Sequence, residues 1–134
     1  MELLYKSTRS ADKTVTASYA ILKGLAEDGG LFVPTAFPKL DVSIDQLAVM
    51  TYQEVAYEVM KLFMTDFTEE ELKHCINSAY DKKFDTENIA ELVKKDDAYY
   101  LELFHGSTIA FKDMALQMLP LLLSAALQIG RAHV

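Results

Sequence analysis

The stretch Glu102-Leu-Phe-His-Gly-Ser-Thr-Ile-Ala-Phe-Lys-Asp113 places one lysine between an apolar segment and a run of helix-forming residues. Residues 98–104 are rich in aromatic and aliphatic side chains and have the length of a buried strand. Residues 113–127 are almost all helix formers. The pattern therefore predicts a strand, a loop and a helix, with Lys112 at the junction of the loop and the helix.

Lys112 is the first candidate for chemistry. An ammonium at a helix N-terminus beside Phe104, Ile109 and Phe111 is disfavoured by the helix dipole and by desolvation, so we expect a lowered pKa for Lys112. An amine with a lowered pKa is a nucleophile that can form a Schiff base. The alternative is a surface lysine that starts a helix, with Asp113 as a favourable acid in the first turn. The three residues Phe-Lys-Asp do not decide between these interpretations.

A longer stretch of sequence around Lys112 decides between the two interpretations. Residues 104–113 closely resemble the cofactor-lysine segment of the threonine synthases, which are pyridoxal-phosphate enzymes of the tryptophan-synthase-β-like family. The chain has Ser107 where the usual family form has proline, which relaxes the loop backbone and leaves the lysine position intact. Residues 5–9 resemble the opening strand of the family, and residues 24–34 resemble its next landmark. The order and spacing of the three matches are more specific than any one motif.

The resemblance implies an α/β fold in two parts. Residues 1–82 are expected to form the threonine synthase N-terminal domain, and residues 83–128 the truncated beginning of a fold-type-II pyridoxal-phosphate domain. The polar stretch 81–88 is the predicted boundary. We also expect the loop that holds the cofactor phosphate to lie beyond residue 134, so that the chain is a fragment that is inactive alone.

The implied reaction is the last step of threonine biosynthesis, the conversion of O-phospho-L-homoserine and water to L-threonine and phosphate with pyridoxal 5'-phosphate as cofactor. The resemblance implies that Lys112 carries the cofactor as a Schiff base, with Phe111 beside it. Ser107, Thr108 and His105 are candidates for substrate binding. Loop hydroxyls also satisfy their own backbone, and a histidine is more often a packing or hydrogen-bonding residue than a base, so the structural interpretations stay open.

Two other functions remain under consideration. One is a different pyridoxal-phosphate lyase or synthase that acts on serine-like or cysteine-like substrates, and the N-terminal landmarks count against it. The other is a noncatalytic relative or a truncated helical interaction module. This function does not explain why the Lys112 loop is intact. The sequence downstream of this chain would discriminate between all three.

Composition bounds the remaining possibilities. The 134 residues are 51% hydrophobic and 25% charged, which is typical of a globular protein. The net charge of −7 argues against a nucleic-acid or anionic-membrane partner, and it does not argue against the small anionic substrate that the resemblance implies. The single cysteine, Cys75, excludes an internal disulfide, has no ligand-type neighbour at metal-binding spacing and fits a cytoplasmic location.

The leucine-rich run around Pro120 is expected to be too short for a membrane span. The sequence does not predict the oligomeric state.

Periodicity and capping signals predict the other elements. We expect a strand over 3–7, a helix over 14–26, a short extended piece over 31–33, and helices over 45–50, 51–63 and 69–80. The helix over 14–26 should bury Val15, Tyr19, Leu22 and Leu25 on one stripe. Capping-box spacing marks the second and fourth helices, at Ser43 with Gln46 and at Thr68 with Glu71. Pro120 is expected to kink the last helix, whose apolar surface would promote self-association in an isolated fragment.

The last residues form a separate problem. Residues 128–134 can be encoded by DNA that reads like a common sequencing adapter, so residues 129–134 are expected to be a non-native tail. The alternative is a helix C-cap at Gly130 followed by a basic tail. For this reason Arg131 and His133 are not offered as site residues.

Overall fold

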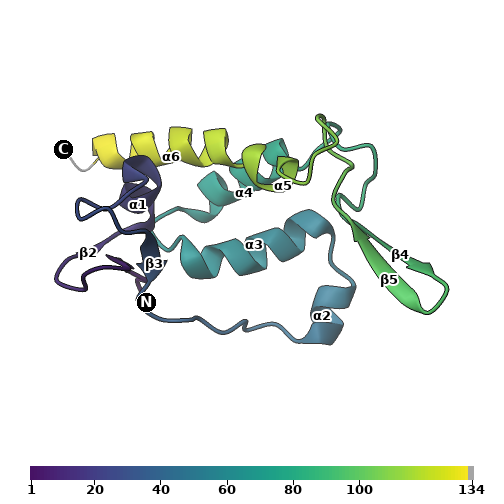
Figure 1. Cartoon of the computed structure of the whole chain (residues 1–134), viewed down its shortest axis with the longest axis horizontal. Helices are drawn as coiled ribbons and strands as arrows, with labels where there is room; N and C mark the ends of the chain where they lie inside the picture. Colours follow the sequence, from purple (N-terminus) through teal and green to yellow (C-terminus); the bar gives the residue numbers. More distant parts are fainter. Residues whose placement is uncertain (133–134) are drawn as a thin grey trace.

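The computed structural model describes residues 1–132 and contains both helices and strands, which confirms the predicted α/β class (Figure 1). The elements in chain order are β1 (Tyr5–Ser7), β2 (Thr14–Val15), α1 (Ala17–Lys23), β3 (Phe32–Pro34), α2 (Ile44–Ala48), α3 (Tyr52–Phe63), α4 (Glu69–Ala79), β4 (Glu91–Lys95), β5 (Ala98–Glu102), α5 (Asp113–Leu116) and α6 (Leu119–Ala132).

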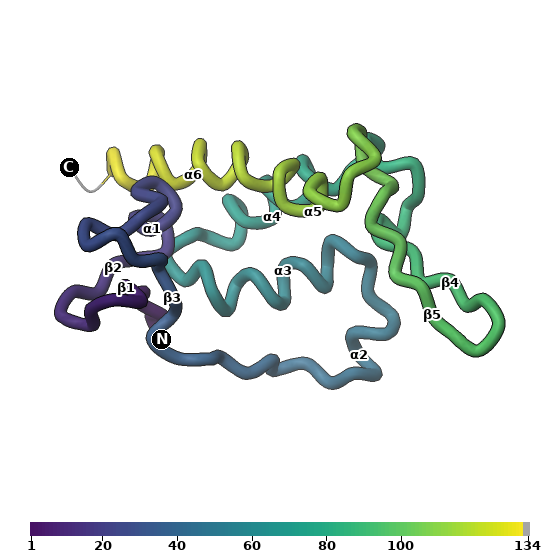
Figure 2. The backbone as a smooth tube through the Cα atoms, in the orientation of Figure 1, coloured from purple at the N-terminus to yellow at the C-terminus, as the bar shows by residue number. Residues whose placement is uncertain are grey.

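The helices form the middle of the molecule, with a small sheet at each end. α6 packs on α1 and α4, and α4 packs on α3. A three-stranded antiparallel sheet in the order β2-β1-β3 lies near the C-terminal end of α6, and the hairpin of β4 and β5 projects from the opposite end (Figures 1 and 2). The Tyr5 hydroxyl donates to the Phe63 carbonyl at 2.6 Å and ties the first sheet to the end of α3.

Capping chemistry sets the starts of three helices. The predicted capping boxes at Ser43 and Thr68 are both present, and Thr51 forms a third with Glu54 that the sequence analysis did not identify. In each box the hydroxyl accepts an N–H from inside the helix, and the glutamine or glutamate accepts the N–H of the capping residue. These local bonds explain why the helix starts were predictable.

The hydrophobic core is centred on one face of α4. This face consists of Leu72, Cys75, Ile76 and Ala79, which are all buried. The residues of α6 that are buried in the same core are Leu122, Ala125, Ala126 and Ile129. The core therefore draws residues from both sides of the domain boundary predicted at 81–88, and it includes Phe84 from that segment and Ile89 directly after it. The boundary itself stays a prediction.

The first helix differs from the prediction for residues 14–26. Thr14 and Val15 pair with β1 as a strand, because β-branched residues fit an extended pair, and the helix begins only after its N-cap Thr16. The helix ends at Lys23 because Gly24 adopts a φ of +77° at the C-cap.

The predicted apolar stripe of that helix is also wrong. Tyr19, Leu22 and Leu25 are exposed, and Val15 is half-buried in β2. The helix instead buries Ala17 and Ser18. The Ser18 amide donates to both carboxylate oxygens of Asp66, and its hydroxyl donates to the same side chain. Tertiary hydrogen bonding, which the apolar periodicity does not record, therefore sets the orientation of this helix.

The strand predicted over 98–104 is shorter and more exposed than expected. It forms β5 in a two-stranded hairpin with β4, and Leu101 is 60% exposed. Its side chains are exposed because no layer among residues 1–132 covers the hairpin. β4 was not predicted, since three of its five residues are charged.

The helix predicted over 113–127 is divided into α5 and α6. Pro120 lies in the first turn of α6, where a helix has no internal partner for its N–H groups, so it does not kink a continuous helix. α6 continues through Gly130, which means that the C-cap alternative at Gly130 is wrong. The interpretation of residues 129–134 as a non-native tail stays a prediction, and its last two residues lie outside the described part of the chain.

By length and composition, Asp113–Ala132 is one stretch that could cross a membrane, so our estimate that this run is too short is wrong. The core helix of a soluble protein meets the same criterion. Residues of α6 do contribute to the core described above.

Truncation of the α4 face tests this core. Leu72→Ala is expected to lower the free energy of unfolding by about 2–5 kcal/mol, because it removes buried methyl groups and leaves a cavity. The exposed Val49 is the control, and Val49→Ala should change the value by less than about 0.5 kcal/mol. Urea unfolding measures both, and equal effects would contradict the proposed core.

Candidate functional site

Lys112 lies where the loop 106–112 meets α5. It occupies the N-cap position of that helix, and its side chain is exposed. Phe104, Ile109 and Phe111 are exposed as well, so the apolar surroundings expected for the ammonium are incomplete. The enclosure is missing because the hairpin and the loop have no covering layer within residues 1–132.

An open apolar cleft of about 580 Å³ lies beside this lysine. Lys112 contributes the only charged side chain of its lining. The other lining residues are Tyr52, Ala90, Leu101, Leu103, Phe111, Met114, Ala115 and Leu116. The arrangement offers a primary amine at the edge of a surface that suits a flat, apolar ring.

A buried carboxylate organises the loop before Lys112. Asp113 is only 2% exposed, and both of its oxygens accept hydrogen bonds from Thr108. The Thr108 amide donates to Oδ2 at 2.8 Å, and the Thr108 hydroxyl donates to Oδ1 at 2.7 Å. Asp113 was expected to act as a favourable acid in the first turn of the helix, and this pair of bonds to Thr108 was not predicted.

Gly106 is required by the same carboxylate. A Cβ atom at this glycine would lie 2.6 Å from Cβ and Oδ2 of Asp113, which is closer than real side chains approach. The Gly106 carbonyl also accepts the Ile109 N–H at 3.1 Å and closes a turn. Gly106 therefore takes part in a turn, and its close approach to Asp113 is the reason that the residue has no side chain.

The loop holds Ile109 in an unfavourable backbone conformation. Its φ is +66°, in the left-handed region that β-branched residues rarely adopt. Such a conformation costs about 1–3 kcal/mol and persists only where the surrounding contacts impose it. Here the neighbouring contacts are the Gly106–Ile109 turn and the two bonds between Thr108 and Asp113.

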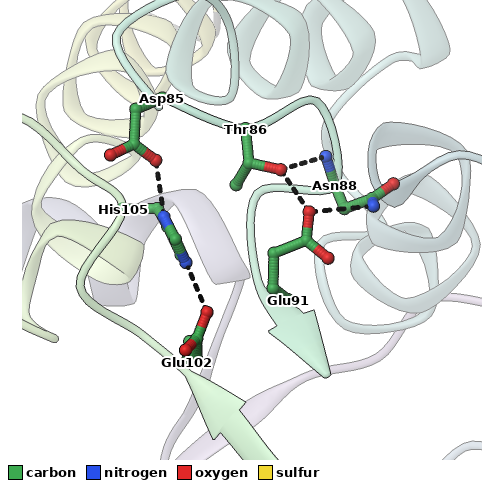
Figure 3. A network of polar contacts seen from close by, with 6 residues as sticks. All are labelled: Asp85, Thr86, Asn88, Glu91, Glu102 and His105. Carbon is green, nitrogen blue, oxygen red and sulfur yellow. Dashed lines mark hydrogen bonds and ion pairs between the residues drawn. The ribbon is translucent and has the colours of Figure 1, made fainter. Parts of the chain in front are cut away.

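His105 bridges two acidic side chains at the entrance to the loop. Its Nδ1 lies 2.5 Å from Oδ1 of Asp85, and its Nε2 lies 3.0 Å from Oε1 of Glu102 (Figure 3). Hydrogen bonds to Glu102 and then to Asp85 raise the pKa of His105 above its usual value, because both partners stabilise the doubly protonated ring. The Asp85 amide also donates to the His105 carbonyl at 3.0 Å. His105 thus joins the end of β5 to the segment after α4.

A second polar cluster lies next to this bridge. The Thr86 hydroxyl and the Asn88 side-chain amide both donate to Oε1 of Glu91 (Figure 3). These two bonds lower the pKa of Glu91, with the Thr86 bond as the larger cause. The cluster fixes the segment between α4 and β4, to which His105 attaches.

The other sequence candidates occupy different positions in the loop. Phe111 lines the cleft with Lys112, and Ser107 is exposed. Thr108 directs its hydroxyl to Asp113, and both ring nitrogens of His105 are engaged, so substrate contact by either residue would require one of these bonds to open. The substrate-binding roles of Ser107, Thr108 and His105 stay predictions.

Tyr80, the residue that follows α4, supports the site through a contact that was not predicted. Its hydroxyl donates to the Met114 carbonyl at 2.7 Å and anchors α5 to the end of α4. Burial raises the pKa of Tyr80 to about 12. Its aromatic character gave no signal of this contact, because the partner is a backbone carbonyl 34 residues away.

No group of three or more histidine, cysteine, aspartate or glutamate side chains in residues 1–132 is placed to hold a metal ion.

Comparison with known proteins identifies consistent relatives. A family model described as the threonine synthase N terminus matches residues 4–80. A threonine synthase from Saccharomyces cerevisiae is 36% identical over 98% of this chain, which covers 27% of that protein. The chain thus spans about a quarter of the length of the curated relatives it matches.

Two solved structures have the same fold over nearly the whole chain. A threonine synthase from yeast matches with a TM-score of 0.86 and 35% identity, over 98% of this chain and 28% of that one. A threonine synthase from Brucella melitensis with bound pyridoxal phosphate matches with a TM-score of 0.85 and 33% identity, over 97% of this chain and 28% of that one. Their coverage extends beyond the N-terminal family match.

The His105 bridge predicts a pH dependence of stability. Since the pKa of His105 is raised in the folded protein, its stabilising contribution is complete below the ordinary value of about 6.5 and is lost as the pH rises through the folded-state pKa. Thermal unfolding from pH 6 to pH 9 should show this loss in the wild type and not in His105→Gln. The exposed His74 provides the control, since His74→Gln should keep the wild-type profile. Identical profiles for wild type and His105→Gln would contradict the bridge.

Proposed function

This chain belongs to the threonine synthase family, and we propose that it provides the N-terminal part of an enzyme that converts O-phospho-L-homoserine and water to L-threonine and phosphate. The proposed cofactor is pyridoxal 5'-phosphate. The observation that carries the proposal is the exposed amine of Lys112 at the edge of an apolar cleft, in a loop whose backbone is held by Asp113.

The residues present fit one side of this cofactor. Lys112 supplies the amine for a covalent attachment, and Phe111 and Leu103 supply apolar surface for a flat ring. A cradle for the cofactor phosphate needs several converging backbone N–H groups or cationic side chains, and we infer that these come from downstream sequence. The fit therefore covers the attachment point and the ring.

The proposed mechanism assigns two tasks to Lys112. Pyridoxal phosphate, when bound, supplies an electron sink for charge that develops next to the substrate amino group. Lys112 would hold the cofactor, and its free amine would move protons at the α, β and γ carbons of the substrate. In the net reaction phosphate leaves the γ carbon and water adds at the β carbon.

The surroundings of Lys112 support these tasks. The aliphatic and aromatic lining of the cleft limits access of water to the reacting carbons once the site is covered. The fixed loop backbone limits the positions from which the amine can reach them. The exposed side chain of Lys112 keeps the freedom to move between attachment and proton transfer.

The cellular setting is also a proposal. A cytoplasmic enzyme is supported by a single cysteine, Cys75, which is free and buried in the core. The net charge of −7 supports a small-molecule substrate rather than a nucleic acid or an anionic membrane. Capture of an anionic substrate requires only a few local donors and is compatible with this overall charge.

Substitution of the lysine tests the proposed reaction in the protein expressed from the full-length coding sequence. Lys112→Ala is expected to abolish the yellow absorbance of bound cofactor and to reduce phosphate release from O-phosphohomoserine by roughly a hundredfold to ten-thousandfold. The exposed Lys82 is the control, and Lys82→Ala should stay yellow and active.

Two results would count against the proposal. A yellow wild-type protein that releases no phosphate would favour a pyridoxal-phosphate enzyme with a serine-like or cysteine-like substrate. A wild-type protein that binds no cofactor would favour a noncatalytic relative.

A further inference from the structure

Two polar residues in the range 1–132 are buried, Ser18 and Asp113. Ser18 is explained by its bonds to Asp66. Asp113 is the other, and it directly follows Lys112. Burial of a carboxylate is unfavourable unless hydrogen bonds replace those that it made with water. The hydrogen bonds of Asp113 therefore indicate its structural role.

Asp113 directs both of its oxygens to one residue. The amide of Thr108 donates to one oxygen and the hydroxyl donates to the other, so the carboxylate fixes the backbone and the side chain of Thr108 together. Gly106 lies against the same carboxylate without room for a side chain. The contact therefore holds the first half of the loop 106–112 against the start of α5.

The second half of the loop is held from the helix side. The Asp113 amide donates to the Ala110 carbonyl at 3.1 Å, and the Leu116 amide donates to the Lys112 carbonyl at 2.8 Å. Met114 is anchored in turn by Tyr80. The backbone of Lys112 is thus restrained on both sides, while its side chain is exposed at the cleft.

We propose that Asp113 is the positioning residue for Lys112, and that its contact with Thr108 fixes the lysine loop before the cofactor binds. This proposal rests on the proposed function, since it concerns the same lysine. It assigns to Asp113 no contact with the substrate or the cofactor. The contact instead restricts the amine to a small set of positions and so speeds capture of the cofactor aldehyde.

Asp113→Asn tests the proposal because the asparagine side chain keeps one acceptor oxygen and replaces the other with a donor. The Thr108 hydroxyl must then accept from the new amide instead of donating, and the bond from the Thr108 amide loses its charged acceptor, so the contact is weakened. In the cofactor-free full-length protein, hydrogen exchange at the Thr108 and Ile109 amides should accelerate by roughly tenfold or more. The rate of cofactor capture, followed by absorbance after addition of pyridoxal phosphate, should fall by a similar factor.

Matched variants separate positioning from a general loss of structure. Thr108→Ser keeps both donors and should behave as the wild type, whereas Thr108→Val keeps only the amide bond and should move both measurements in the same direction as Asp113→Asn. Asp97→Asn, at an exposed position in the β4–β5 turn, should change neither. If Asp113→Asn does not fold, the pair Thr108→Ser and Thr108→Val still decides the question.

The outcomes are distinguishable from failure of the proposed function. Unchanged amide exchange in Asp113→Asn and Thr108→Val would overturn the restraint itself. Faster exchange with cofactor capture at the wild-type rate would overturn the positioning role. A wild-type protein that does not capture the cofactor would remove the proposed function, and with it the assignment of Asp113 to positioning of a cofactor lysine.

Discussion

The buried face of α4 is the constraint on which the rest of this structure depends. Its four residues, Leu72, Cys75, Ile76 and Ala79, are each 1% exposed or less. Full burial of a leucine or isoleucine side chain stabilises a fold by about 1.5–3 kcal/mol. Burial of this face therefore stabilises the packing of α3 and α6 against α4. Because α6 follows the lysine loop in sequence, this packing also fixes where the end of that loop lies.

The site is connected to this core at two further points. Tyr80, at the end of α4, holds the start of α5 through the Met114 carbonyl, and His105 holds the other end of the loop through Asp85. Between these points the contact of Asp113 with Thr108 sets the loop itself. The site thus combines a restrained backbone with an open surface, which is compatible with the proposed attachment of a cofactor to Lys112.

Local signals in the sequence were enough for some of these features. The helices that begin at Ile44 and Glu69 were predicted from the spacing of capping residues, since the bonds concerned join residues three apart. The position of Lys112 between strand and helix followed in the same way from apolar patterns. The family resemblance added the fold of the N-terminal region, which the solved relatives confirm.

Other features depend on contacts that the pattern does not contain. Thr14 pairs with Lys6 in a sheet, so the helix does not begin at residue 14 as predicted. Ser18 is buried against Asp66, so the helix does not bury the predicted apolar stripe. The apolar side chains of β5 predicted burial, but their covering layer is not part of residues 1–132. The Asp113 contact was missed although its partner is only five residues away, because an acid after a lysine also satisfies the usual preference for a helix start.

The most direct test of the central claim is chemical identification of the lysine that holds the cofactor. The full-length protein loaded with pyridoxal phosphate would be treated with sodium borohydride, which fixes the cofactor to its lysine, and then digested for peptide mass mapping. We predict that the added mass is on Lys112. Modification of another lysine at full occupancy, with Lys112 unmodified, would contradict it.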